Sequence, residues 1–398
     1  MMPGRRLGRW ALLCCLLAPA AICRELDGAE IRLSEDCPPG YLEREGRCHL
    51  VSLYDQYASF TGQGGLRAAL PPPARSYTAA QIDLGRYLFF DPLLSRERDM
   101  SCANCHRPAL GFSDGQARAM GRDPAIPAGE PATGRLLPRN TPGLWNIGFF
   151  RLLSWDGKRT DLVAQSLAPV FAADEMNLDA GELARRLRQS AYGALLARAF
   201  GKDERYRTLP LVEQAAHALA AFQGSLVSLN SRYDYYVFGA NDALSEQELR
   251  GLTLFRSFDT RCSECHTPPL FSNQQLATLG VPEPVGKPFD SGAQAVFGRE
   301  DLRGAFRIPG LRNVALTAPY MHNGVFGQLE DVVKFYADGR GNSASPAEAL
   351  KIHWHIVHPR LDPQQQGDLV AFLRALTDTS HMPRIPTSLP SGLSISAR

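Results

Sequence analysis

The chain has 398 residues, of which 44% are hydrophobic and 21% are charged, and its formal net charge is +2. This length suffices for two or three domains with cores of their own, and the near-neutral charge gives no electrostatic reason to expect nucleic-acid binding. Beyond the N-terminal two dozen residues, no segment approaches the ~20 apolar residues of a membrane-spanning helix, so we expect no transmembrane segment.

The first 23 residues have the pattern of a secretory signal peptide. A basic start is followed by a short apolar stretch over 10–18 and then by small residues. We therefore expect a Sec-type signal peptide over 1–23 and a mature protein in the periplasm. Lipoprotein acylation of Cys23 is the less favoured alternative, because Ile22 stands where a small residue is wanted. The basic residues are Arg5, Arg6 and Arg9.

Residues 24–76 form an N-terminal extension that ends in a stiff linker, Pro71–Pro73. Cys37 and Cys48 are the two cysteines that belong neither to the signal peptide nor to the motifs described next. In an oxidising compartment two such cysteines are expected to pair. We predict a Cys37–Cys48 disulfide; two free thiols are the alternative, which export disfavours.

After this linker the chain contains two similar units. A Gly-x-x-Leu-Phe pentad begins at Gly85 and again at Gly251, each on an expected helix and each followed by a Cys-x-x-Cys-His motif. The second of these helices opens with a Ser-x-x-Glu capping box at Ser245. Each unit closes with an amphipathic helix, expected over 211–227 and 363–376.

The two Cys-x-x-Cys-His motifs predict two covalently attached c-type haems. Each motif supplies two thiols for the vinyl groups of haem and one histidine for the iron. A four-cysteine zinc site is an alternative, but it leaves both histidines without a role, and a thioredoxin-like redox pair would not recur with a histidine behind it. The motif residues are Cys102, Cys105 and His106 in the first unit, and Cys262, Cys265 and His266 in the second.

The helices and the haem motifs together predict the fold class. Strand signals are scarce, so we expect a mostly α protein with two cytochrome-c-like haem domains in tandem behind the short extension. The first domain is expected over 77–240, the second over 241–385, and a C-terminal tail over 386–398. The segment 107–140 is rich in Gly, Pro and Arg and is expected to be a long loop.

The two haems are not expected to be equivalent. Between His106 and Trp155 there is no further histidine, and the only methionine is Met120, in a Gly- and Arg-rich segment. A six-coordinate haem passes electrons, whereas a five-coordinate haem binds peroxide or dioxygen. We therefore expect an open, reactive face on the first haem.

From about residue 77 to residue 380 the chain resembles the bacterial di-haem cytochrome c peroxidase family, which includes MauG and the MbnH-type enzymes. The resemblance covers most of the mature chain and implies a peroxide-dependent haem oxidoreductase. Besides the haem motifs, the matching strings are Arg139-Asn140-Thr141-Pro142, Trp155-Asp156-Gly157, Gln165-x-x-x-Pro169, Glu175-Met176 and Leu316-Thr317-Ala-Pro319-Tyr320-Met-His322-Asn-Gly324.

The resemblance also implies roles for single residues. Trp155 matches the family tryptophan between the two haems, where an indole relays electrons. Gln165, Pro169 and Glu175 match positions on the distal side of the first haem, where Glu175 would move the peroxide proton as general base and acid. Without the resemblance, Trp155 fits a core position in a turn equally well, and Glu175 fits a solvated loop position better.

A calcium site between the two domains is a further implication of the resemblance. Asn140 and the backbone carbonyls of Thr317 and Pro319 match its positions, and hard oxygen ligands suit this ion. Ordinary turn chemistry is the alternative, because these residues are not a dense carboxylate cluster.

Two departures from typical peroxidases of the family concern the axial ligands. Those enzymes have a histidine in the loop before Arg-Asn-Thr-Pro, which must leave the iron on activation, and this chain has none there. Tyr336 stands where those enzymes have a methionine on the second haem. MauG also has a tyrosine at this position. A tyrosinate is a hard, anionic donor, so it favours oxidised iron and lowers the reduction potential. A merely buried tyrosine on an amphipathic helix over 329–336 is the alternative.

These features predict a periplasmic MauG/MbnH-like enzyme. It would use hydrogen peroxide to form a high-valent two-haem state that oxidises an aromatic residue, Trp or Tyr, of a partner protein. The first alternative is a cytochrome c peroxidase that reduces peroxide to water with electrons from a small cytochrome or cupredoxin. The second is a non-catalytic di-haem electron carrier.

The exit toward the partner is expected to differ from that of MauG. Thr260 occupies the position of the surface tryptophan that MauG uses, two residues before the second haem motif. Three histidines, His353, His355 and His358, surround Trp354. They suggest either a metal site or a polar edge near a haem.

Overall fold

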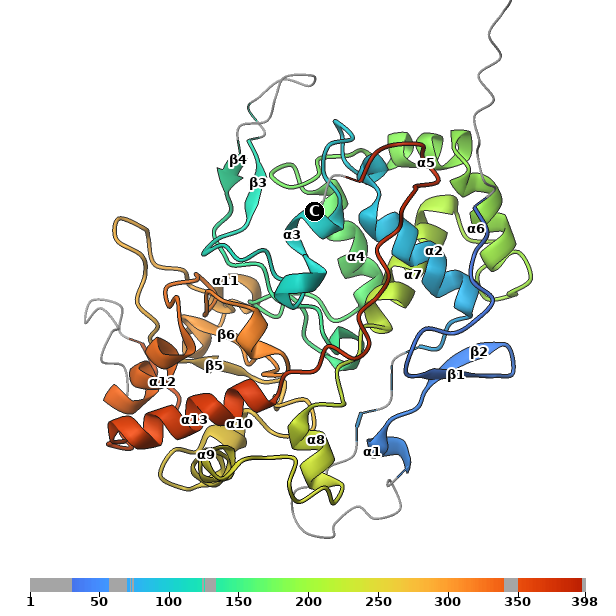
Figure 1. Cartoon of the computed structure of the whole chain (residues 1–398). Coiled ribbons are helices and arrows are strands. Elements are labelled where there is room, and N and C mark those ends of the chain that lie inside the picture. The colour runs from blue at the N-terminus through green and yellow to red at the C-terminus, as the bar shows by residue number, and fades with distance from the viewer. Residues whose placement is uncertain are drawn as a thin grey trace, which may run out of the picture. The chain divides into compact units, whose positions relative to one another are not determined.

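The computed structural model describes residues 31–56, 70–71, 73, 75–123, 125, 134–339 and 350–395. The predicted signal peptide at 1–23 lies outside these residues, as does part of the extension. Within them the fold is mostly α, as predicted, with three antiparallel strand pairs (Figure 1). None of the described helices is both long and apolar enough to span a membrane. The division into haem domains after residue 240 stays a prediction.

Figure 1 shows the order of the helices and strands along the chain. The helices are α1 (Leu53–Gln56), α2 (Ala79–Phe90), α3 (Cys102–Cys105), α4 (Leu162–Phe171), α5 (Ala180–Gln189), α6 (Tyr192–Phe200), α7 (Leu211–Gly224), α8 (Arg232–Val237), α9 (Glu246–Arg256), α10 (Cys262–Cys265), α11 (Gln294–Phe297), α12 (Leu329–Asp338) and α13 (Pro363–Ala375). The strand pairs are β1 (Tyr41–Arg44) with β2 (Arg47–Leu50), β3 (Met120–Arg122) with β4 (Gly134–Leu136), and β5 (Leu276–Thr278) with β6 (Ala305–Arg307).

The repeated pentad marks a helix crossing in each half of the chain. A Cβ atom on Gly85 of α2 would lie 1.8 Å from the carbonyl oxygen of Ala218 on α7, and one on Gly251 of α9 would lie 2.0 Å from that of Asp368 on α13. Only glycine allows backbones to approach this closely. The pentad is therefore a packing device that brings the helix before each haem motif onto the closing helix of its unit.

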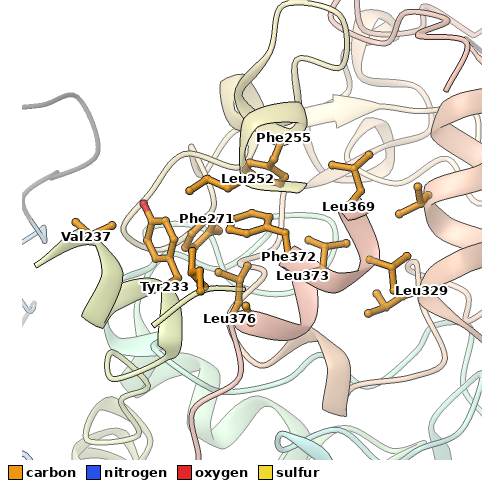
Figure 2. Packing of buried hydrophobic residues seen from close by; sticks show 14 of the residues in the cluster. Tyr233, Val237, Leu252, Phe255, Phe271, Leu329, Leu369, Phe372, Leu373 and Leu376 are labelled. Carbon is orange, nitrogen blue, oxygen red and sulfur yellow. The ribbon is translucent and has the colours of Figure 1, made fainter. Parts of the chain in front are cut away.

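Aromatic side chains fill the space beside both crossings. The ring centroids of Phe89 and Phe222 lie 5.1 Å apart in the first half, and those of Phe255 and Phe372 lie 5.1 Å apart in the second. In the second half these rings belong to a continuous buried cluster, shown in Figure 2. Its labelled members are Tyr233, Val237, Leu252, Phe255, Phe271, Leu329, Leu369, Phe372, Leu373 and Leu376.

The N-terminal extension is tied to the rest of the chain by buried polar contacts. Cys37 and Cys48 form a disulfide at the β1–β2 hairpin, with a Cα–Cα distance of 5.5 Å. Tyr54 donates a 2.6 Å hydrogen bond to Asp234, which also forms a bidentate ion pair with Arg312. Because Asp234 and Arg312 are almost fully buried, each needs the other as a partner.

The segment 107–140 is not only a loop, which corrects the prediction made from its composition. It contains the antiparallel pair β3 and β4 and a short 3-10 turn at Pro108–Leu110. The amide of Arg122 donates to the carbonyl of Asp174, and a Cβ on Gly121 would lie 2.1 Å from the same oxygen. The hairpin thus satisfies backbone groups by packing on a segment some fifty residues away, which local composition does not reveal.

Candidate haem centres

The first haem motif is built on α3 and the residue that follows it. Cys102 and Cys105 are free cysteines, and the Nδ1 atom of His106 lies 2.8 Å from the carbonyl oxygen of Phe112. With Nδ1–H donated to this carbonyl, Nε2 is the nitrogen left for a metal. Burial lowers the pKa of His106, so the ring is neutral, as a ligand must be.

Glu175 lies in the turn after α4, close to this motif. Burial raises the pKa of the Cys102 thiol to about 12, with a contribution from Cys105 and a smaller one from the Glu175 carboxylate. The carboxylate acts in the same direction on Cys105. Burial also raises the pKa of Glu175 itself. A half-buried carboxyl of raised pKa beside a haem attachment site suits a group that takes up and returns a proton.

Two further predicted distal residues lie on α4. Pro169 stands inside the helix, and Gln165 stands one turn earlier. The hydroxyl of Ser154 lies 3.4 Å from Gln165 Oε1, which connects α4 to the turn that carries Trp155. The structure therefore brings Gln165 near the predicted relay, while the roles of Gln165 and Pro169 stay predictions.

The second haem motif is built on α10 in a similar way. His266 Nδ1 lies 3.0 Å from the carbonyl oxygen of Phe271 and 3.2 Å from that of Pro309, which again leaves Nε2 for a metal. A large, mainly apolar cavity opens here, and its lining includes Cys262, Cys265 and His266. The cavity has the apolar walls that haem requires.

Tyr336, on α12, lines the same cavity. Burial raises the pKa of its phenol, and the sulfur groups of Cys262 and Cys265 act in the same direction. A buried phenol of this kind stays protonated unless a cation offsets the burial, and ferric iron supplies such a charge. Tyr336 and His266 thus line one cavity, and the ligand role of Tyr336 stays a prediction.

Trp155 connects the two halves of the chain. Its indole Nε1 donates a 2.9 Å hydrogen bond to the carbonyl of Asn140, and its own carbonyl accepts one of 2.7 Å from the amide of Arg307 on β6. Trp155 also lines the cavity that contains His266. The turn is held by Arg139, which forms ion pairs with Asp156 at 2.6 Å and with Asp290 at 2.7 Å. The indole is thus fixed between segments of both units.

The predicted calcium residues are partly gathered. The side-chain amide of Asn140 lies 2.7 Å from the carbonyl oxygen of Gln116 and 3.3 Å from that of Pro319. Thr317 packs its methyl group against Gly111, where a Cβ would lie 2.7 Å away. The carbonyl oxygens of Gln116 and Pro319 are uncharged. The side-chain amide of Asn140 can face them with either its nitrogen or its oxygen, depending on the orientation of the amide. The donor set suits calcium that keeps several waters.

Two buried groups lining the cavity fit haem, and local sequence signals did not reveal them. Arg307 is 4% exposed, and its guanidinium has no carboxylate partner among the described residues. Desolvation by burial lowers its pKa to about 10. The indole nitrogen of Trp145 is also buried without a hydrogen-bond partner. An indole N–H that is buried without a partner is costly. The propionates of haem are acceptors that would suit it and the guanidinium of Arg307, whose Nε donates to the carbonyl of Ser154 at 3.2 Å.

Comparisons with known proteins show the family of this chain. Residues 79–242 match the family model of the di-haem cytochrome c peroxidases. The chain is 34% identical to the methylamine utilization protein MauG of Methylorubrum extorquens over 77% of this chain and 80% of that protein. It is 32% identical to the cytochrome-c peroxidase IdrP1 of Denitromonas iodatirespirans over 86% and 93% of the two chains.

A solved structure shows the same fold. The crystal structure of a MauG-like protein associated with microbial copper homeostasis superposes with a TM-score of 0.68 at 31% identity. The match covers 79% of this chain and 94% of that one. The chain therefore belongs to the family of di-haem cytochrome c peroxidases and MauG proteins, and it is a haem-dependent oxidoreductase with two c-type haems.

Proposed function

We propose that this protein is a periplasmic enzyme that uses hydrogen peroxide to oxidise an aromatic side chain, Trp or Tyr, of a partner protein. The observation that carries the proposal is the inequality of the two haem sites. Tyr336 lines the cavity beside the second motif, where burial raises the pKa of its phenol. Glu175, a carboxyl with a raised pKa, lies beside the first motif. One site is suited to proton-coupled peroxide chemistry, and the other to holding oxidised iron.

Each site residue has its own role in the proposed reaction. Bound haem supplies the redox chemistry, in which hydrogen peroxide takes up two electrons and two protons and gives two molecules of water. Glu175 accepts a proton from peroxide and returns it as water forms. Gln165 and Pro169 shape the space beside it. Trp155 relays electrons toward the first site, and Tyr336 holds the second iron in its oxidised states.

A cytochrome c peroxidase is the second candidate function. The similarity to IdrP1, which is named a cytochrome-c peroxidase, favours it. In that case the electrons would come from a small soluble cytochrome or cupredoxin, and no side chain of a partner would be modified. Tyr336 argues against it, because a tyrosinate lowers the reduction potential and makes electron uptake from such donors less favourable.

Mixing fully ferric holoprotein with one equivalent of hydrogen peroxide separates the candidates. The proposal predicts that a long-lived oxidised product forms in the absence of any donor, which optical absorption detects. It also predicts that the protein oxidises ferrous cytochrome c slowly. Rapid, catalytic oxidation of ferrous cytochrome c would support the plain peroxidase instead. Unchanged spectra after peroxide would indicate an electron carrier and would contradict both enzymes.

We further propose that calcium binds at Asn140 with the carbonyl oxygens of Thr317 and Pro319. The contacts of Asn140 with Gln116 and Pro319 support this position. Asn140 also accepts the indole hydrogen bond of Trp155 through its backbone carbonyl. The ion would therefore stabilise the turn that presents the relay tryptophan.

A further inference from the structure

An exposed tryptophan lies beside the second haem motif. Trp354 is 63% exposed, whereas Trp145 is buried and Trp155 is only partly accessible. Among the described residues, Trp354 is thus the tryptophan that a second protein can reach. Its neighbour His353 is anchored, because the backbone amide of His353 donates a 2.9 Å hydrogen bond to the carbonyl of Thr278 on β5.

A short chain of contacts joins this indole to the haem attachment site. The Nδ1 atom of His355 lies 3.9 Å from the sulfur of Cys265, although the two residues are ninety positions apart in sequence. The ring centroids of His355 and Trp354 are 3.8 Å apart, with an angle of 72° between the planes. His355 Nε2 lies 3.0 Å from a carboxylate oxygen of Glu264, which holds the imidazole between the sulfur and the indole.

The histidines here do not make a convincing metal site. Ligand atoms of Cys265, His353 and His355 lie within 4.8 Å of one another. The sulfur of Cys265 is a thioether once haem is attached, and a thioether is a much weaker ligand than a thiolate. Two histidines remain, and the backbone amide of His355 approaches the Nδ1 atom of His353 at 3.3 Å. The cluster is better explained as a bridge from Cys265 to the surface.

Thr260 does not provide a competing route. Its hydroxyl donates to the carbonyl of Leu254 at the end of α9, so it closes a helix end and carries no oxidisable ring. Phe258 is 83% exposed, but a benzene ring is much harder to oxidise than an indole. The guanidinium of Arg261 lies 5.4 Å from the ring centre of Trp354 and 6.0 Å from that of Phe258. It contacts both aromatic rings and forms an ion pair with Glu264 at 3.6 Å.

We propose that Trp354 is the surface residue through which the partner protein delivers electrons to the second haem, with His355 as the bridge to Cys265. This inference rests on the proposed function. The indole gives one electron to the oxidised haem and releases its N–H proton to water. It then regains one electron from the aromatic side chain of the partner and one proton from water. Two such cycles supply the two electrons that hydrogen peroxide takes up.

The exposure of the indole favours loss of the proton together with the electron. The 63% exposure of Trp354 gives the N–H group access to water, and Arg261, 5.4 Å from the ring centre, forms an ion pair with Glu264 at 3.6 Å. The ring of Trp354 is therefore uncharged both before and after it gives up its electron and proton. A partner must place an aromatic side chain against this face, because electron transfer slows steeply with distance.

The test uses the holoprotein with both haems and one equivalent of hydrogen peroxide, without a partner. We expect W354F and H355L to form the oxidised product as fast as the wild type but to return several-fold more slowly to the ferric state. Mass spectrometry should find oxygen added to Trp354 in the wild type and much less of it in H355L, where Trp354 remains exposed. The matched control is Y235F, which changes an exposed ring on α8 and should behave as the wild type.

A control measures whether peroxide attacks the exposed indole directly. The same reaction is run with cyanide, which binds the iron of an open haem and prevents its reaction with peroxide. The inference is overturned if Trp354 is oxidised equally with and without cyanide, or if W354F decays like the wild type. W354Y should restore most of the decay rate, because tyrosine is also oxidisable. If no oxidised product forms in any variant, the proposed function fails; if it forms normally and decays without Trp354, only this inference fails.

Discussion

The helix crossing at Gly251 offers a quantitative test of how the second haem site is built. A Cβ there would lie 2.0 Å from the carbonyl oxygen of Asp368, whereas ordinary contacts begin at 3.4 Å, so α9 and α13 must move apart by more than an ångström in G251A. Overpacking of this kind costs about 1–3 kcal/mol, and the upper end applies because the obstacle is backbone. Replacing a helical glycine by alanine returns about 0.5–1 kcal/mol. We expect a net loss of about 2 kcal/mol in the free energy of unfolding.

Denaturation by guanidinium chloride, followed by circular dichroism and by haem absorption, measures this loss. G367A is the matched control, since Gly367 lies inside α13, the partner of α9 in this crossing, but its nearest atom outside the helix, on Gln247, is 3.9 Å away. That substitution should stabilise the protein by about 0.5–1 kcal/mol. Because Phe255 and Leu369 line the haem cavity, G251A should also shift the absorption of the second haem. Equal or greater stability of G251A would refute the packing argument.

Three further predictions concern the site. The pKa of Glu175 is raised by burial, so the rate of reaction with peroxide should fall as pH drops through a value above the usual glutamate range, and stopped-flow rates of E175Q should be low and lack this dependence. R307M removes a buried cation from the cavity and should lower the reduction potential of the second haem in a spectroelectrochemical titration; an unchanged potential would place the guanidinium elsewhere. Metal analysis after dialysis should find calcium in the wild type and less in N140A, and equal contents would reject the proposed site.

Local signals predicted the helical framework well. The capping box predicted at Ser245 is present, and the closing helices end at Gly224 and Ala375, close to the expected ends. These features depend on side chains a few positions apart, so the sequence displays them directly. The strand pair β3–β4 was missed because its strands are short and its backbone groups pair partly with the carbonyl of Asp174.

The site was predicted by resemblance rather than by local pattern. Tyr336 lies in the same cavity as Cys262, and Glu175 lies near Cys102, which are contacts across many residues that no local periodicity encodes. Arg307 and the contact between Cys265 and His355 were not predicted at all. Both depend on how distant loops fold onto the haem cavity, so only the assembled chain reveals them.

Low-temperature electron paramagnetic resonance of the resting ferric holoprotein tests the central claim most directly, because it reports the coordination of each iron. The account predicts one high-spin signal from the haem held by His106 and one low-spin signal from the haem held by His266 and Tyr336. In Y336F the low-spin signal should convert to high spin, and in the wild type both ferric signals should decrease after peroxide is added. Two low-spin signals that ignore peroxide, or a Y336F spectrum identical to that of the wild type, would contradict the account.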